Sequence, residues 1–123
     1  MNLGALNDEA QSHWKRADND LQECRELLAQ GQSRWAVVAL FYSALHRVQT
    51  YLVQEATQPR SHVQRDQLVR QHLSQVADAY LRLKAVSEYA RYEPTFTIGV
   101  AEVQAMLDSE YATIVIAVTT RLP

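Results

Sequence analysis

The chain has 123 residues, of which 47% are hydrophobic and 21% are charged, and its formal net charge is −2. This size and composition predict one globular domain over residues 1–123 and exclude long disorder, while the slight negative charge argues against a general nucleic-acid coat protein. No apolar run reaches the ~18 residues of a membrane span, and the N-terminal residues lack the basic-then-apolar pattern of a secretion signal, so we expect a cytoplasmic protein without membrane contact.

Cysteine and lysine are rare in this chain. The single cysteine, Cys24, excludes an internal disulfide and a multi-cysteine zinc site, and its place in an apolar helical pattern predicts a buried or half-buried small hydrophobe. Only Lys15 and Lys84 are lysine among twelve cations; the others are arginine. Arginine binds phosphate or carboxylate with two parallel hydrogen bonds, although a genome rich in G and C produces the same bias.

The first predicted helix begins near Asn7 or Asp8, since either can cap the free amides of a first turn. It ends at Gly31, because glycine readily adopts the left-handed conformation that follows a last helical turn. Between these points the apolar residues recur every three or four positions, which is typical of an amphipathic helix. They are Trp14, Ala17, Leu21, Cys24, Leu27 and Leu28.

The second predicted helix, "RWAVVALFYSALHRVQTYLVQEA" (34–56), is the most apolar segment. Ser33 is its expected cap, and Pro59 closes it. Roughly 23 residues without a breaker are too many for a strand. Because the segment is apolar over more than half its circumference, we expect it at the centre of the fold.

Three more helices complete the predicted fold. A capping box of Ser61 and Gln64 indicates a short helix over about 61–72, followed by a longer one within 73–92. The last helix is expected over about 100–120, although its tail "YATIVIAVTT" has the β-branched content of a strand. Because no convincing partner strand is visible, the predicted fold class is all-α: an up-and-down helical bundle of four long helices plus one short helix.

The short third helix carries the strongest chemical pattern. The stretch "QPRSHVQRDQLVRQH" (58–72) gathers three arginines and two histidines in an otherwise slightly acidic chain. At 100° per residue, His62, Arg65 and His72 fall on one helix face, and Arg60 stands beside the free amides of the helix N-terminus. Imidazoles can move the proton of a ribose 2′-hydroxyl, and a guanidinium can hold phosphate oxygens. Arg65, His72 and His62 are therefore candidate catalytic residues for a phosphodiester, without a cofactor or metal.

Five further residues are candidates for substrate binding. Arg60 belongs to the same stretch, Tyr42 and His46 lie four residues apart on the second helix, and Arg91 and Tyr92 end the fourth. A purely structural role is the alternative for His46 and Arg91. His46 would then be a core-edge histidine bonded to a carbonyl or to Tyr42, and Arg91 would be the cation expected at a helix C-terminus.

A structural interpretation is also open for the third helix. His62 and Arg65 could pair with Glu55, with Asp66 or with the fourth helix, and His72 could be solvated. His62 and Asp66 stand four residues apart, but two ligands do not make a zinc site, and a salt bridge explains the spacing as well.

Three stretches, "ALFYSALHRVQTYL", "PRSHVQRDQLV" and "YLRLKAVSEYARY", resemble the HEPN superfamily, and the likeness extends over about residues 10–118. Its more specific parts are the Ser-His-x-x-Arg and Ala-Arg-Tyr pieces. The resemblance implies a helical bundle that dimerises, and many members are metal-independent endoribonucleases acting as toxins or in phage defence. Their active motif is an arginine followed, after four to six residues, by a histidine. Arg65 and His72 match this motif, and Asp66 is the polar residue after the arginine. The tyrosine that some toxin members carry two positions after the histidine is Ser74 here.

Two hypotheses of different classes follow. The leading one is a HEPN-like nucleotide- or RNA-binding domain, with an endoribonuclease of a toxin–antitoxin or defence module as its active form. The resemblance then implies a homodimer, with RNA or a nucleotide as ligand and an antitoxin or another protein as partner. The alternative is a catalytically inactive helical protein-interaction domain, in which the cations of 58–72 form salt bridges.

Overall fold

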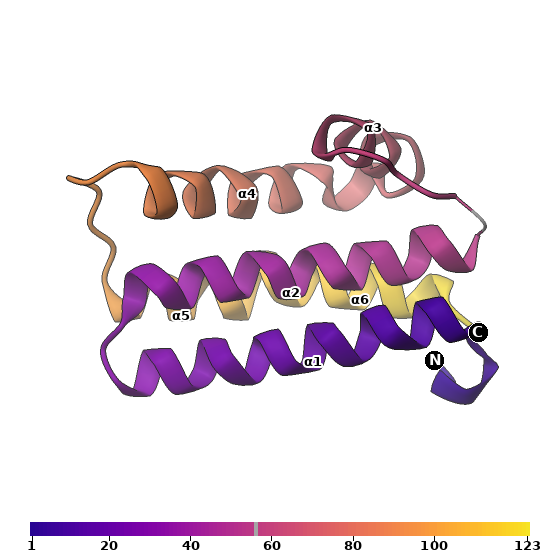
Figure 1. The fold of residues 1–123 in the computed structure, drawn as a ribbon, viewed down its shortest axis with the longest axis horizontal. Helices are drawn as coiled ribbons and strands as arrows, with labels where there is room; N and C mark the ends of the chain where they lie inside the picture. The colour runs from indigo at the N-terminus through magenta and orange to yellow at the C-terminus, as the bar shows by residue number, and fades with distance from the viewer. Residues whose placement is uncertain (56) are drawn as a thin grey trace.

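The computed structural model describes residues 1–55 and 57–123, and within them it contains helices and no strand, so the all-α prediction is confirmed (Figure 1). The helices are α1 (Asp8–Ala29), α2 (Ser33–Gln54), α3 (His62–His72), α4 (Ala77–Tyr92), α5 (Val100–Met106) and α6 (Ala112–Arg121). Short 3-10 turns, Leu3–Ala5 and Ser74–Val76, precede α1 and α4, and a π-helical segment, Leu107–Tyr111, joins α5 to α6. None of the described helices is both long and apolar enough to cross a membrane.

Helices α1 and α2 form an antiparallel hairpin. Asn7 caps α1 as predicted, because its side-chain oxygen accepts a hydrogen bond from the Ala10 amide at 2.8 Å. Gly31 has a φ of +74°, and its amide donates to the carbonyl of Leu28. This left-handed residue ends the helix and reverses the chain, as the glycine predicted.

Helix α2 lies at the centre, packed against α1, α4 and α6 (Figure 1). Phe41 and Leu40 are fully buried there, and burial of each side chain contributes roughly 1.5–3 kcal/mol. The expected capping role of Ser33 is wrong. Ser33 is the first residue of α2, and its hydroxyl donates to the carbonyl of Ile98, so it attaches the loop before α5 instead.

Helix α3 begins at a modified capping box. The Ser61 hydroxyl accepts from the Gln64 amide at 3.1 Å, while the Gln64 side chain accepts from the amide of Arg60, one residue before the cap. Val69 is its one buried residue, so α3 keeps most of its polar surface free. It lies beside the N-terminal end of α4, and in Figure 1 it is seen nearly end-on.

The β-branched C-terminal tail is helical. Residues 100–121 run through α5, the π-helical segment and α6, and Ile114 and Val118 are fully buried. The strand that their propensity allowed is therefore overridden by packing against α2. Cys24 is fully buried as predicted, and burial raises the pKa of its thiol to about 11.

Candidate functional site

Arg65 of α3 is the centre of a group of basic side chains from four helices. Its Nε donates to Gln49 Oε1 of α2 at 2.9 Å, and its Nη1 lies 3.2 Å from Nδ1 of His62. Gln49 is buried, so this amide fixes the guanidinium in place. Both partners are neutral groups, and Arg65 makes no ion pair with a carboxylate of the described residues. No carboxylate of residues 1–55 or 57–123 therefore neutralises its positive charge.

The charge of Arg65 acts on histidines from three helices: His13 of α1, His46 of α2 and His62 of α3. Burial is the largest cause of the lowered pKa of each imidazole, and Arg65 lowers all three further. For His46, burial with His13, Arg16 and Arg65 lowers the pKa to about 4. His46 is thus uncharged at neutral pH.

His13 and His46 form a direct pair. Their Nδ1 atoms are 3.0 Å apart and their rings stack at 5.2 Å between centroids, so one imidazole donates the Nδ1 proton and the other accepts it. The pair borders an open hollow of about 500 Å³ that Arg16 also lines. The expectation that the ring of His46 bonds a carbonyl or Tyr42 is therefore wrong.

His13 was not a candidate from the sequence, although a signal for it existed. His13 stands 18 residues before Gly31 and His46 stands 15 residues after it. In an antiparallel hairpin turning at Gly31, residues at similar distances from the turn come side by side.

Helix α4 brings a second guanidinium to the same region. Arg91 Nη1 donates to the Tyr42 hydroxyl at 2.8 Å, and the guanidinium carbon lies 5.0 Å from the ring centre of Tyr92. The Nε atom of Arg91 is buried and has no hydrogen-bond acceptor in the described part of the chain. An unsatisfied buried donor is costly, so this atom favours an oxygen ligand. Arg91 is also close enough to lower the pKa of His62.

Asp66 takes part in the cluster through another partner than expected. It forms an ion pair with Lys84 of α4, not with Arg65 or His62. Lys84 is thereby neutralised. The alternative in which Arg65 pairs with Asp66 or Glu55 does not describe this structure.

His72 and Arg60 lie at the margins. His72 is the exposed last residue of α3, and its side chain bonds to no described residue. Seven helical positions separate it from Arg65, which is ~10 Å along the axis. Arg60 is exposed before α3, where only its amide is bonded. Of the predicted residues, the structure brings together Arg65, His62 and His46, and pairs Arg91 with Tyr42.

We name Arg65, Arg91, His13, His46 and His62 the basic cluster. Its two guanidiniums have no carboxylate partner among residues 1–55 and 57–123, and its imidazoles are held toward their neutral form. This arrangement can bind an anion and accept a proton beside it. No group of three or more described His, Cys, Asp or Glu residues could hold a metal ion. No protein-family model matches the chain, and no curated protein matches it significantly.

Proposed function

We propose that the chain is a HEPN-like domain that binds RNA at the basic cluster and cleaves it as a metal-independent endoribonuclease. One observation carries the proposal: Arg65, bonded to neutral groups alone, contacts His62 and is close enough to lower the pKa of His13 and His46. The HEPN resemblance supports the same substrate class, and a HEPN-type bundle that forms a homodimer belongs to the proposal.

In the proposed reaction, Arg65 holds the non-bridging oxygens of the cleaved phosphodiester. Arg91, bonded to Tyr42 seven positions before Gln49 on α2, holds a neighbouring phosphate. In the free chain His62 Nδ1 accepts from Arg65, so the imidazole acts as a base only once Arg65 turns to the phosphate and releases this nitrogen. His62 Nδ1, whose pKa is lowered by partial burial and by nearby cations, then takes the proton of the adjacent ribose 2′-hydroxyl. The 2′-oxygen then forms a bond to phosphorus, and the bond from phosphorus to the 5′-oxygen breaks. The imidazolium of His62 returns the proton to the leaving 5′-oxygen. The products are a 2′,3′-cyclic phosphate and a free 5′-hydroxyl.

We assign the proton transfer to His62 and not to His72, the histidine of the HEPN motif. His62 lies 3.2 Å from Arg65, whereas His72 is two helical turns further along α3. His62 is also exposed, so its replacement tests the chemistry at little cost to the fold.

The test is cleavage of a labelled single-stranded RNA pool by the purified protein in EDTA. We expect the wild type to leave cyclic-phosphate ends, and His62→Gln to cleave about 10²–10⁴-fold more slowly, the usual contribution of a positioned acid–base group. His72→Gln is the matched histidine control, and Arg70→Gln, an exposed cation of the same helix, is the charge control. Both controls should keep wild-type rates.

Arg65→Ala should also abolish cleavage. Because it leaves the buried Gln49 without its donor, its unfolding free energy must be measured beside its activity. If the wild type does not cleave while Arg65→Ala loses about 1–3 kcal/mol of stability, the cluster is scaffolding and the protein-interaction hypothesis replaces this one. Full activity of His62→Gln with loss in His72→Gln would move the acid–base role to the motif histidine.

A further inference from the structure

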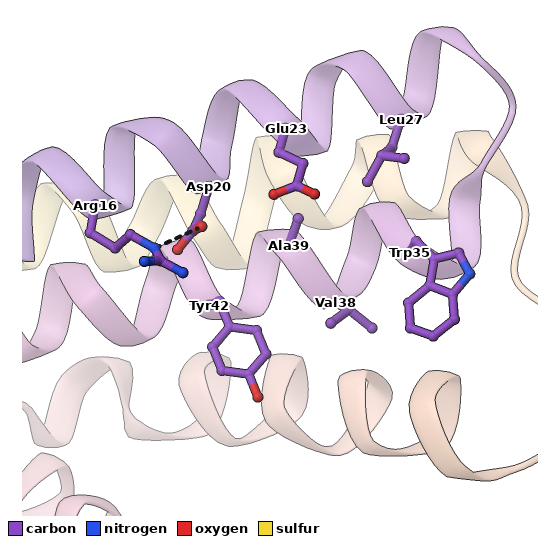
Figure 2. A pocket seen from close by; sticks show the side chains of 8 residues that line it. All are labelled: Arg16, Asp20, Glu23, Leu27, Trp35, Val38, Ala39 and Tyr42. Carbon is purple, nitrogen blue, oxygen red and sulfur yellow. Dashed lines mark hydrogen bonds and ion pairs between the residues drawn. The ribbon is translucent and has the colours of Figure 1, made fainter.

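A groove lies between α1 and α2 (Figure 2). It is a cavity of about 420 Å³, within the range of small-ligand sites. One end is polar, formed by Arg16, Asp20 and Glu23; the wall toward the other end is apolar, formed by Leu27, Trp35 and Val38. Such a combination of an apolar wall and a few convergent polar groups is typical of a site for a flat organic ligand.

Asp20 has an unsatisfied oxygen at the polar end. Its side chain is only 9% exposed, and Oδ1 accepts from Arg16 Nε at 3.4 Å. The other oxygen, Oδ2, is buried and bonded to no described residue. Leaving a buried carboxylate oxygen without a donor is costly, so a small rotation of the Asp20 side chain into the groove, where Oδ2 can accept from an N–H or O–H group of a ligand, is favoured.

Glu23 places a second acceptor beside Asp20. The two residues are three positions apart on α1, so their side chains lie on one face, and both line the groove (Figure 2). The Glu23 carboxylate is close enough to raise the pKa of Asp20, after the larger effect of burial, while Arg16 opposes both. Two neighbouring acceptors best match a ligand that offers two neighbouring donors.

Among the RNA bases, guanine alone offers two such donors on its pairing edge, N1–H and the N2 amino group. Adenine and cytosine place an acceptor beside their amino group, and uracil has one N–H between two carbonyls. Recognition through a base's pairing edge, with stacking on an aromatic side chain, is how proteins usually read an unpaired base. Trp35, 51% exposed on the apolar wall, offers a stacking surface.

The groove is connected to the basic cluster by two residues. Tyr42 lines the groove, and its hydroxyl accepts from Arg91 of the cluster at 2.8 Å. Arg16 lines both the groove and the hollow beside the His13–His46 pair. A base in the groove would therefore have its own phosphate near Arg91.

We propose that this groove is a guanine subsite, in which Asp20 Oδ2 and Glu23 accept from N1–H and the N2 amino group while the phosphate lies on Arg91. The inference rests on the proposed function, because it places the phosphate at the proposed RNA site. It names the substrate class of that site: RNA with a guanine beside the cleaved bond.

The test is calorimetric binding of guanosine, inosine and adenosine monophosphates to the full chain. We expect guanosine monophosphate to bind about 5- to 150-fold more tightly than adenosine monophosphate, the discrimination of one good paired contact. Inosine monophosphate, which lacks only the N2 amino group, should fall between them. Asp20→Asn, which turns an acceptor into a donor, should remove the preference without weakening the adenosine nucleotide.

Glu23→Gln is the second variant, because Glu23 is exposed and its replacement leaves the fold intact even if Asp20→Asn unfolds. Glu26→Gln, on the same helix but outside the groove, is the matched control and should bind as the wild type does. Equal affinity for all three nucleotides, lost in Arg91→Gln but not in Glu23→Gln, would overturn the guanine subsite and leave the basic cluster standing. No binding of any nucleotide would overturn both proposals.

Discussion

The histidines of the basic cluster show how burial controls a titratable group in this protein. His46 is half-buried, and its ring faces His13 while Arg16 and Arg65 add positive charge nearby. Protonating His46 would add a cation where three basic groups already lie. The fold therefore keeps this imidazole neutral, and the same property that suits a proton acceptor at neutral pH weakens the fold in acid.

The lowered pKa of His46 predicts a loss of stability in acid. The pKa is about 4 in the folded protein and about 6.5 in the unfolded chain, so between these values the unfolded state binds more protons. The stabilisation from neutral His46 is complete above pH ~6.5 and is lost as the pH falls toward 4. After allowance for its partial exposure to solvent, we expect the free energy of unfolding to fall by about 2 kcal/mol over this range.

Urea unfolding at a series of pH values measures this effect. His46→Gln should flatten the pH dependence, whereas His72→Gln, which removes an exposed histidine, should leave it as in the wild type. An unchanged slope in His46→Gln would mean that His46 does not titrate as the structure implies.

At the scale of helices, the π-helical segment Leu107–Tyr111, which precedes α6, forms hydrogen bonds with the α1–α2 hairpin. Within it, the Tyr111 hydroxyl accepts from Arg47 Nε at 3.1 Å and is 2.7 Å from Ser43 Oγ. Arg47 is itself buried, and it pairs with Asp18 of α1 at 2.8 Å. One wide turn thus aims a tyrosine at a polar group inside the core, a use that π-helical turns often have.

Removing the Tyr111 hydroxyl should destabilise the protein. Tyr111→Phe keeps the ring but leaves buried Arg47 Nε without an acceptor, so we expect a loss of about 1–3 kcal/mol in the free energy of unfolding. Tyr51→Phe is the matched control, because the Tyr51 hydroxyl bonds to no described residue and its removal should cost little. Thermal or urea unfolding of both variants measures the two changes in the free energy of unfolding. Equal losses of stability in Tyr111→Phe and Tyr51→Phe would refute a special role for the π-helical segment.

Local spacing was enough to predict the helices and the all-α class. The start at Asn7 and the end at Gly31 depend on neighbours a few residues away, and both are where the sequence placed them. The role of Ser33 was not predictable in this way, because its acceptor, the carbonyl of Ile98, is 65 residues distant. The π-helical turn likewise depends on what Tyr111 meets in the core.

Some contacts of the candidate site could likewise be predicted from local spacing, whereas others depend on how the helices pack. That His62 adjoins Arg65 follows from their spacing of three on one helix. Tyr42 and Arg91 were both candidates, but their bond joins α2 to α4 and depends on how those helices pack. His13 was missed for the same reason, since its partner His46 lies on the next helix.

Across the whole molecule, the charge of −2 and the positive basic cluster predict a local mode of binding. A protein with a large positive charge attracts nucleic acid over many phosphates, whereas in this chain the 14 acidic residues outnumber the 12 cations, and we assign RNA binding to Arg65 and Arg91 of the basic cluster. Affinity for RNA should therefore come from a few phosphates at one place.

The salt dependence of RNA binding measures how many phosphates are contacted. For single strands each neutralised phosphate contributes about −0.7 to the slope of log K against log salt concentration, so two guanidiniums predict about −1.4. Fluorescence anisotropy with a short labelled RNA, on the His62→Gln background to prevent cleavage, gives this slope. Arg91→Gln should reduce its magnitude by about 0.7, while Arg121→Gln at the end of α6 should not change it. A slope several-fold steeper, insensitive to Arg91, would place RNA on a wide surface outside the basic cluster.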